Sequence, residues 1–130
     1  MSDYLVTNFG TQYLQGQLCI PTRMIVAEDT DSIETRVWCD CWVFWYDESG
    51  DTLKTVSGGN HSGCMTIQQK DGHPVVIAFE QTVDGAGNEA SAKRIFGQHF
   101  DIYQNMHSNP EVREAVRKEQ LQEFLRQQGK

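Results

Sequence analysis

The central feature of the sequence is the run Val37-Trp38-Cys39-Asp40-Cys41-Trp42-Val43-Phe44-Trp45-Tyr46. β-Branched and aromatic residues fill both alternating positions of this run, which is typical of a central strand covered on both faces. The apolar pattern extends from residue 34 to residue 46. We therefore expect a long inner strand here, with other strands on either side of it.

Three further strands are predicted around this one. The first covers residues 18–28 and ends in the turn cluster 29–32; the third covers 53–56 and resumes at 65–69 after a glycine-rich interruption; the last covers 74–82. Asp71-Gly72 is a strong signal for a two-residue hairpin. Because all the predicted connections are short, the four strands should form an antiparallel meander.

Helices are predicted at both ends of the chain. The apolar spacing favours a helix over residues 3–15, capped by Ser2 or Asp3 and stopped at Gly16. A second helix is expected over 90–107, and Ser108-Asn109-Pro110-Glu111 begins a third. The apolar face of the second comprises Ala92, Ile95, Phe96, His99, Ile102, Tyr103 and Met106.

The predicted fold class is α+β, with a curved four-stranded antiparallel sheet packed on an N-terminal helix and two C-terminal helices. Such a sheet is expected to keep one face for helices and to leave a hollow at one end. No repeat or long linker divides the sequence, so we expect one domain over residues 1–130.

Charge and composition restrict the partners. The chain has a formal net charge of −7, and residues 1–90 hold 13 acidic and 4 basic side chains. An acidic chain without a Lys/Arg cluster repels phosphate backbones, so nucleic acid is not an expected partner. No apolar run reaches the roughly 20 residues that span a bilayer, so a soluble protein is expected, without a membrane partner.

The first residues, Met1-Ser2-Asp3-Tyr4, lack the basic and apolar segments of a signal peptide. We therefore expect a cytoplasmic protein with reduced thiols. An exported protein from which the signal had been trimmed could begin in the same way, and its four cysteines could then form disulfides.

Asp40 is the most informative candidate for chemistry. Side chains two residues apart in a strand share a face, so Asp40 should lie among Trp38, Trp42, Phe44 and Tyr46. Burial of an unpaired carboxylate raises its pKa, as in general bases. The alternatives are that this face is partly wet, or that Asp40 accepts hydrogen bonds from neighbouring strands or from Arg36.

His61 and Glu80 are the other candidate catalytic residues. His61 lies in the glycine-rich segment 57–64, which predicts a bulge or a close backbone approach. It could transfer protons together with Asp40 or Glu80; the alternative is a bulge whose polar groups satisfy the local backbone. Glu80 could face the same hollow as Asp40 or could face solvent.

The cysteines do not form a strong metal motif. Cys39 and Cys41 alternate on one strand face, and His61 with Cys64 makes a single weak pair. Buried free thiols are the expected explanation, and no metal or other cofactor is predicted. His99 is expected to pack in the core, whereas His73 and His107 fall in turns and carry no functional signal.

In architecture the chain resembles the nuclear-transport-factor-like superfamily, which has a cystatin-like α+β roll and includes ketosteroid isomerases and scytalone dehydratase. The segments 51–59, 63–65 and 91–97 are similar to those of small bacterial proteins. The resemblance implies a helix packed into a curved sheet with an acid and aromatic residues facing inward. Members usually have several helices before the sheet, and no motif here matches the catalytic Asp and Tyr of the isomerases.

Three functions follow from these observations. The leading hypothesis is a domain that binds a small apolar or aromatic molecule in a sheet–helix cavity, lined by the aromatic residues and His61, with Asp40 as polar anchor. The second is a cofactor-free isomerase or lyase that uses Asp40 or Glu80 as base and His61 as acid. The third is a homodimeric interaction module with an exposed aromatic sheet face.

Overall fold

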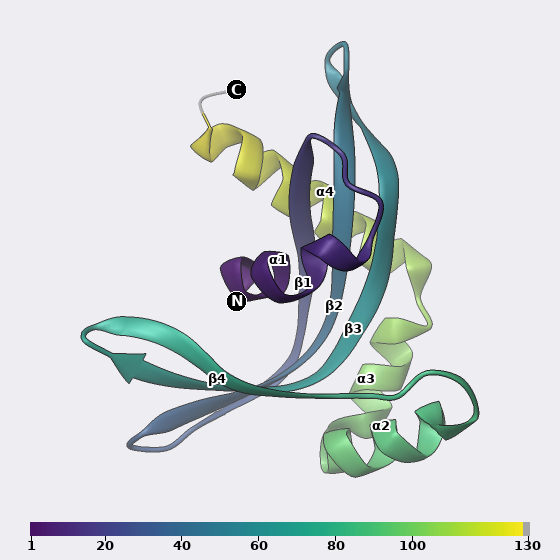
Figure 1. Cartoon of the computed structure of the whole chain (residues 1–130). Helices are drawn as coiled ribbons and strands as arrows, with labels where there is room; N and C mark the ends of the chain where they lie inside the picture. Colours follow the sequence, from purple (N-terminus) through teal and green to yellow (C-terminus); the bar gives the residue numbers. More distant parts are fainter. Residues whose placement is uncertain (129–130) are drawn as a thin grey trace. The chain divides into compact units, whose positions relative to one another are not determined.

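The computed structural model describes residues 1–128, and its elements follow the predicted order (Figure 1). The strands are β1 (Leu18–Thr30), β2 (Glu34–Ser49), β3 (Thr52–Lys70) and β4 (His73–Gln81). The helices are α1 (Ser2–Phe9), α2 (Asn88–Phe96), α3 (Phe100–His107) and α4 (Pro110–Gln127), with short 3₁₀ helices at Gly10–Gln12, Gly85–Gly87 and Gly97–His99. The strands lie in the order β1-β2-β3-β4, and short turns join antiparallel neighbours. The predicted α+β layout with a curved antiparallel sheet is confirmed.

The residues group into two compact units. Unit 1 comprises Met1–Arg23, Cys41–Asn60 and the chain from Pro110 onward, and unit 2 comprises Met24–Asp40 and His61–Asn109. Unit 1 therefore contains α1 and α4, unit 2 contains β4, α2 and α3, and the three long strands contribute residues to both.

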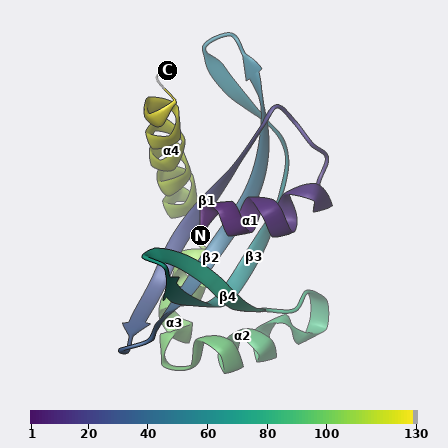
Figure 2. The same cartoon turned by 60° about the vertical axis from the view of Figure 1, so that its left-hand side comes forward.

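In unit 1, helices cover both faces of the strands. The Trp45 indole N–H donates to the Gly10 carbonyl at 2.8 Å, which holds the end of α1 against one face of β2. On the other face, Tyr46 belongs to an apolar cluster against which Leu121 and Phe124 of α4 pack. Figures 1 and 2 show α1 and α4 on opposite sides of the strands. The prediction that β2 is covered on both sides is confirmed here, and the expectation that the sheet keeps one face for helices is wrong.

In unit 2, the core forms between β2 and two helices, α2 and α3. Figure 2 shows these helices as neighbours that are consecutive along the chain. The predicted helix over 90–107 is broken at Gly97, whose φ of 52° ends α2. The break changes which face of α3 is buried, and the side chain of Ile102 is 53% exposed, contrary to its predicted place on the apolar face. The buried members of this core are Trp38, Ala92, Ile95, Phe96 and Tyr103.

The glycine-rich segment does not interrupt the third strand, since β3 is continuous from Thr52 to Lys70. That part of the prediction is wrong, but the expected close approach is confirmed. A Cβ on Gly58 would overlap the Phe44 ring, and a Cβ on Gly63 would overlap the Glu80 carbonyl oxygen. Glycine is needed in this strand because neighbouring atoms occupy the space of a side chain.

The ends of the elements follow local rules with one exception. Asp71 and Gly72 both have positive φ, at 53° and 79°, as a type I′ turn requires, and α4 begins at Pro110 as predicted. The exception is α1, which ends at Phe9 instead of residue 15 and has no side-chain cap from Ser2 or Asp3. None of the helices in residues 1–128 is both long and apolar enough to cross a membrane.

Candidate functional site

Asp40 is fully buried in β2, and its carboxylate contacts polar side chains of unit 2. Ser62 Oγ of β3 donates to Asp40 Oδ1 at 2.6 Å, and His107 Nδ1 lies 3.0 Å from Asp40 Oδ2. One alternative expected from the sequence was that Asp40 accepts hydrogen bonds from a neighbouring strand, and the contact with Ser62 of β3 agrees with it. A buried carboxylate is tolerated where both oxygens are satisfied in this way.

His107 is the partner of Asp40 that sequence reasoning missed. It is the last residue of α3, one helical turn after Tyr103, and the two rings stack at a centroid distance of 5.3 Å. The His107 side chain is 40% exposed, whereas Asp40 is not exposed at all. Burial raises the pKa of the Tyr103 phenol, and a hydrogen bond with Ser62 opposes this shift. The i, i+4 spacing of Tyr103 and His107 was the only signal in the sequence.

The structure does not bring His61 together with Asp40. Successive side chains of a strand point to opposite faces, and Ser62 is the one that faces Asp40. His61 is buried on the other face, where its Nδ1 lies 2.9 Å from Gln81 Oε1 of β4. The β3 residue that donates to Asp40 is thus Ser62, and proton transfer between Asp40 and His61 stays a prediction.

Glu80 lies at the surface of unit 2. Arg94 Nη1 donates to Glu80 Oε2 at 2.8 Å, and both side chains are more than half exposed. Exposed ion pairs of this kind contribute little to stability. The sequence left open whether Glu80 pairs with Asp40 or faces solvent. In the structure, Glu80 faces solvent.

The aromatic residues predicted to bind ligand contact the protein's own side chains. Trp38 is buried in unit 2, where its indole N–H donates to the Ile95 carbonyl at 3.0 Å. In unit 1, Arg113 of α4 stacks over Trp42, and the Arg117 guanidinium lies 4.1 Å from the ring centroid of Phe44. Arg117 Nε also donates to the Tyr46 hydroxyl at 2.8 Å. Arginine–aromatic stacking thus covers the rings of Trp42 and Phe44 and stabilises α4 on the sheet.

All four cysteines are free thiols. Cys39 and Cys41 are fully buried, as small apolar residues often are. Within residues 1–128 no cluster of three or more His, Cys, Asp or Glu residues is arranged to hold a metal ion. His99, expected in the core, is half-buried, with its ring 4.7 Å from that of Trp38.

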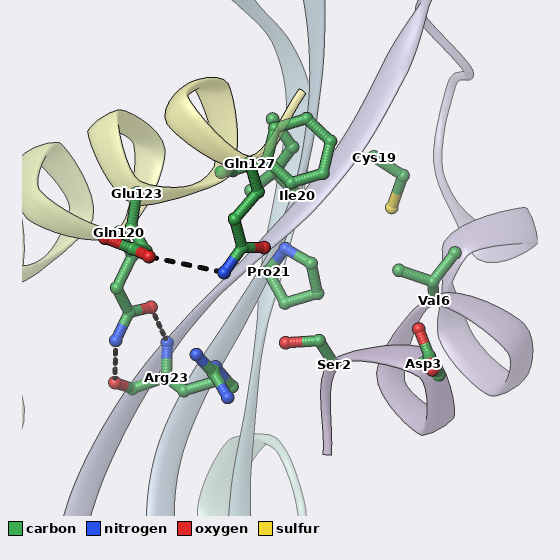
Figure 3. A pocket seen from close by; sticks show the side chains of 11 residues that line it. Ser2, Asp3, Val6, Cys19, Ile20, Pro21, Arg23, Gln120, Glu123 and Gln127 are labelled. Atoms are coloured by element: carbon green, nitrogen blue, oxygen red, sulfur yellow. Dashed lines mark hydrogen bonds between the residues drawn. The ribbon is translucent and has the colours of Figure 1, made fainter. Parts of the chain in front are cut away.

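Unit 1 contains a cavity of about 280 Å³ between β1, α1 and α4 (Figure 3). Its apolar lining comes from all three elements: Val6, Ile20, Pro21 and Phe124. Polar groups complete the lining: Ser2, Asp3, Cys19, Arg23, Gln120, Glu123 and Gln127. Burial raises the pKa of the Cys19 thiol. None of these residues was a candidate from the sequence.

Arg23 is held in this cavity through its backbone. Gln120 Oε1 accepts from the Arg23 backbone N–H, and Gln120 Nε2 donates to the Arg23 carbonyl, each at 2.7 Å (Figure 3). β1 is an edge strand, so the amide of Gln120 takes the place of a neighbouring strand here. Arg23 is half-buried, and its Nε is shielded from solvent and has no hydrogen-bond acceptor within residues 1–128.

Two other hollows are more polar or less enclosed. One in unit 1, of about 430 Å³, lies between the β2–β3 hairpin and α4 and includes Tyr46, Leu53, Arg117 and Leu121. One in unit 2, of about 490 Å³, has the charged residues Glu28, Asp29 and Arg36 around Trp38 and His99. The cavity at Arg23 differs in having both an apolar lining and an unsatisfied buried donor.

Comparison of the chain with family models, with curated proteins and with solved structures finds no match. The resemblance to the nuclear-transport-factor-like superfamily therefore stays a prediction.

Proposed function

We propose that this protein binds a small apolar or aromatic molecule in the cavity between β1, α1 and α4. The ligand class is the one expected from the sequence. The site is different, because it lies at the outer edge of β1 and not on the aromatic face of β2. The observation that supports it is a hollow in which apolar side chains from three elements lie beside polar and charged ones, because ligand sites use apolar contacts for affinity and polar groups for orientation.

The size of the cavity limits the ligand. Drug-sized ligands occupy pockets of about 300–1,000 Å³, and this cavity has about 280 Å³. A single aromatic ring or a branched aliphatic chain with one polar end is therefore the expected scale. The apolar part would contact Val6, Ile20 and Phe124, and the polar end would lie at the Arg23 side.

Binding can be tested by titrating 2-phenylethanol and 4-methylphenol and recording amide chemical shifts and thermal stability. We expect saturable shifts of Val6, Cys19 and Phe124, together with a higher melting temperature. Val6→Phe fills the cavity and should abolish the shifts, whereas Val83→Phe, at an exposed position of unit 2, should leave them unchanged. Shifts that do not saturate, or that survive Val6→Phe, would contradict the proposal.

A homodimer is also expected from the sequence, and the surface that favours one is the edge strand β4, not an aromatic face of the sheet. The Trp and Tyr side chains do not form an exposed face, but β4 is an edge strand whose residues Val75 and Ile77 are exposed. The run Val75–Phe79 carries no charge, so antiparallel pairing with β4 of a second copy would meet no like-charge repulsion. Light scattering of the wild type and of Ile77→Lys tests this: a dimer that becomes a monomer supports it, and a monomeric wild type refutes it.

The isomerase or lyase alternative has weaker support. It needs an acid and a base that reach one substrate, and Asp40, His61 and Glu80 point to different surroundings. Asp40 is instead paired with Ser62 and His107. The binding proposal is therefore preferred.

A further inference from the structure

The cavity between β1, α1 and α4 contains opposite charges as well as an apolar lining. From these we infer that its ligand is a zwitterion, with a carboxylate and an ammonium on one apolar or aromatic skeleton, as in a free apolar amino acid. The inference rests on the proposed function and adds the chemical class of the ligand.

The carboxylate is inferred from Arg23. In residues 1–128 the Arg23 guanidinium makes no ion pair within 4.0 Å, and its solvent-shielded Nε–H meets no acceptor among these residues. A half-buried cation in this state is destabilising unless an acceptor arrives. A carboxylate offers two oxygens at the spacing of the guanidinium edge, so rotation of Arg23 onto it would satisfy Nε–H and a terminal N–H together.

The ammonium is inferred from the acidic residues that line the same cavity. Glu123 is already engaged by Arg126 and by Gln127 Nε2. Asp3 is exposed at the start of α1 and has no ion pair with any residue in the range 1–128. A ligand with only a negative charge would be attracted by Arg23 and repelled by Asp3, and a ligand with only a positive charge would meet the reverse. A zwitterion complements both.

The apolar part of the ligand is limited by the remaining lining. Val6, Ile20 and Phe124 supply the apolar wall. At about 30 Å³ per water, the cavity volume of about 280 Å³ corresponds to roughly nine waters. A ligand of roughly nine to twelve heavy atoms, such as leucine or phenylalanine, matches this scale.

The test uses four compounds with one phenyl skeleton in calorimetric titrations of the full chain: L-phenylalanine, 3-phenylpropionate, 2-phenylethylamine and 2-phenylethanol. We expect L-phenylalanine to bind about tenfold more tightly than the compounds with a single charge, because each charge-assisted contact adds to affinity. L-Leucine serves as a second zwitterion with an aliphatic skeleton.

Variants assign each charge to its residue. Arg23→Gln should weaken L-phenylalanine and 3-phenylpropionate about tenfold and leave 2-phenylethanol unchanged. The substitution keeps the fold, since Gln120 binds only the backbone of residue 23. Asp3→Asn should weaken L-phenylalanine and 2-phenylethylamine. Arg94→Gln, which removes an exposed arginine of unit 2, is the matched control and should change none of the four affinities.

Alkylation of cysteine by iodoacetamide locates the ligand. Cys19 lines the cavity and Cys64 does not, and burial raises the pKa of both thiols. Bound L-phenylalanine should slow the labelling of Cys19 severalfold and leave that of Cys64 unchanged.

The outcomes separate the two proposals. If 2-phenylethanol binds and protects Cys19 as well as L-phenylalanine does, the zwitterion inference is wrong and the binding function stands. If none of the compounds, including L-leucine, binds or protects Cys19, both are wrong. Equal affinities of wild type and Arg23→Gln for L-phenylalanine would also overturn the inference.

Discussion

A buried carboxylate is stable only where hydrogen bonds replace the water that it loses, and Asp40 meets this condition through Ser62 and His107. The same contacts that could serve chemistry also join β2 to β3 and to the end of α3 within unit 2. Removal of the carboxylate therefore leaves two polar groups without their acceptor, at a cost that can be measured.

We expect Asp40→Ala to lower the free energy of unfolding by about 2–4 kcal/mol. Asp40→Asn should cost less, because the amide oxygen can still accept from Ser62 Oγ. Urea unfolding measures both, with Asp84→Ala at an exposed position as control. A change of less than about 0.5 kcal/mol for Asp40→Ala, which is typical of surface positions, would show that these contacts do not stabilise unit 2.

At the level of single residues, strand periodicity predicted the burial of Asp40 but not its partners. Ser62 and His107 meet Asp40 through the pairing of β2 with β3 and through the path of α3, which one sequence does not encode locally. The cavity was not predicted, because its lining comes from three distant segments. One signal was present: Arg23 is the first basic residue of the chain and lies within an apolar strand.

Among the elements, β3 depends most strongly on glycine. Gly63 lies opposite Gln81 in the β3–β4 pairing, and a side chain there would meet the backbone of Glu80. Because backbone cannot move aside as a flexible side chain can, we expect Gly63→Ala to destabilise the protein by about 1–3 kcal/mol and to shift the amide resonances of β4.

The matched control is Gly10→Ala. A Cβ at Gly10 would lie 3.5 Å from Cys19 Sγ and 3.7 Å from the Trp45 ring, which are ordinary contacts. Its helical backbone conformation also suits alanine. Urea unfolding should therefore show a much smaller loss than for Gly63→Ala; equal losses would mean that the contact with Glu80 is not the cause.

The same comparison shows which element features local sequence rules can predict. The Asp71-Gly72 hairpin and the start of α4 at Pro110 follow from backbone preferences of those residues, and both were predicted. Gly97 was read as part of a continuous helix, because a glycine within a helical pattern is compatible with either continuation or a break. The tertiary environment decides between them, and here α2 ends.

For the whole molecule, the layout of helices and strands was predictable, whereas the grouping into two units was not. Strand periodicity and short turns suffice for the order of the sheet. The boundaries between the two units fall within β1, β2 and β3, and no change in amino-acid composition along the sequence indicates them. A single domain over residues 1–130 therefore stays a prediction.

Alkaline pH provides a test of stability that involves both units. Burial is the main cause that raises the pKa of four groups above their ordinary values of 9.0 for thiols and 10.0 for phenols: Cys19, Tyr46, Cys64 and Tyr103. A raised pKa means that the folded protein holds these protons more tightly than the unfolded chain. The resulting stability is fully present below about pH 9 and is lost as pH rises through the raised values.

We therefore expect the urea midpoint to stay nearly constant between about pH 7 and pH 9 and to fall steadily toward about pH 11. Tyr46→Phe removes one of the four groups, so its midpoint should fall less steeply with pH, although its stability at neutral pH is lower because Arg117 loses a hydrogen-bond partner. The decisive measurement is the slope rather than the level. A midpoint that is flat or rises up to about pH 11, or a slope that Tyr46→Phe leaves unchanged, would mean that the phenol of Tyr46 is no more protected from ionisation in the folded protein than in the unfolded chain.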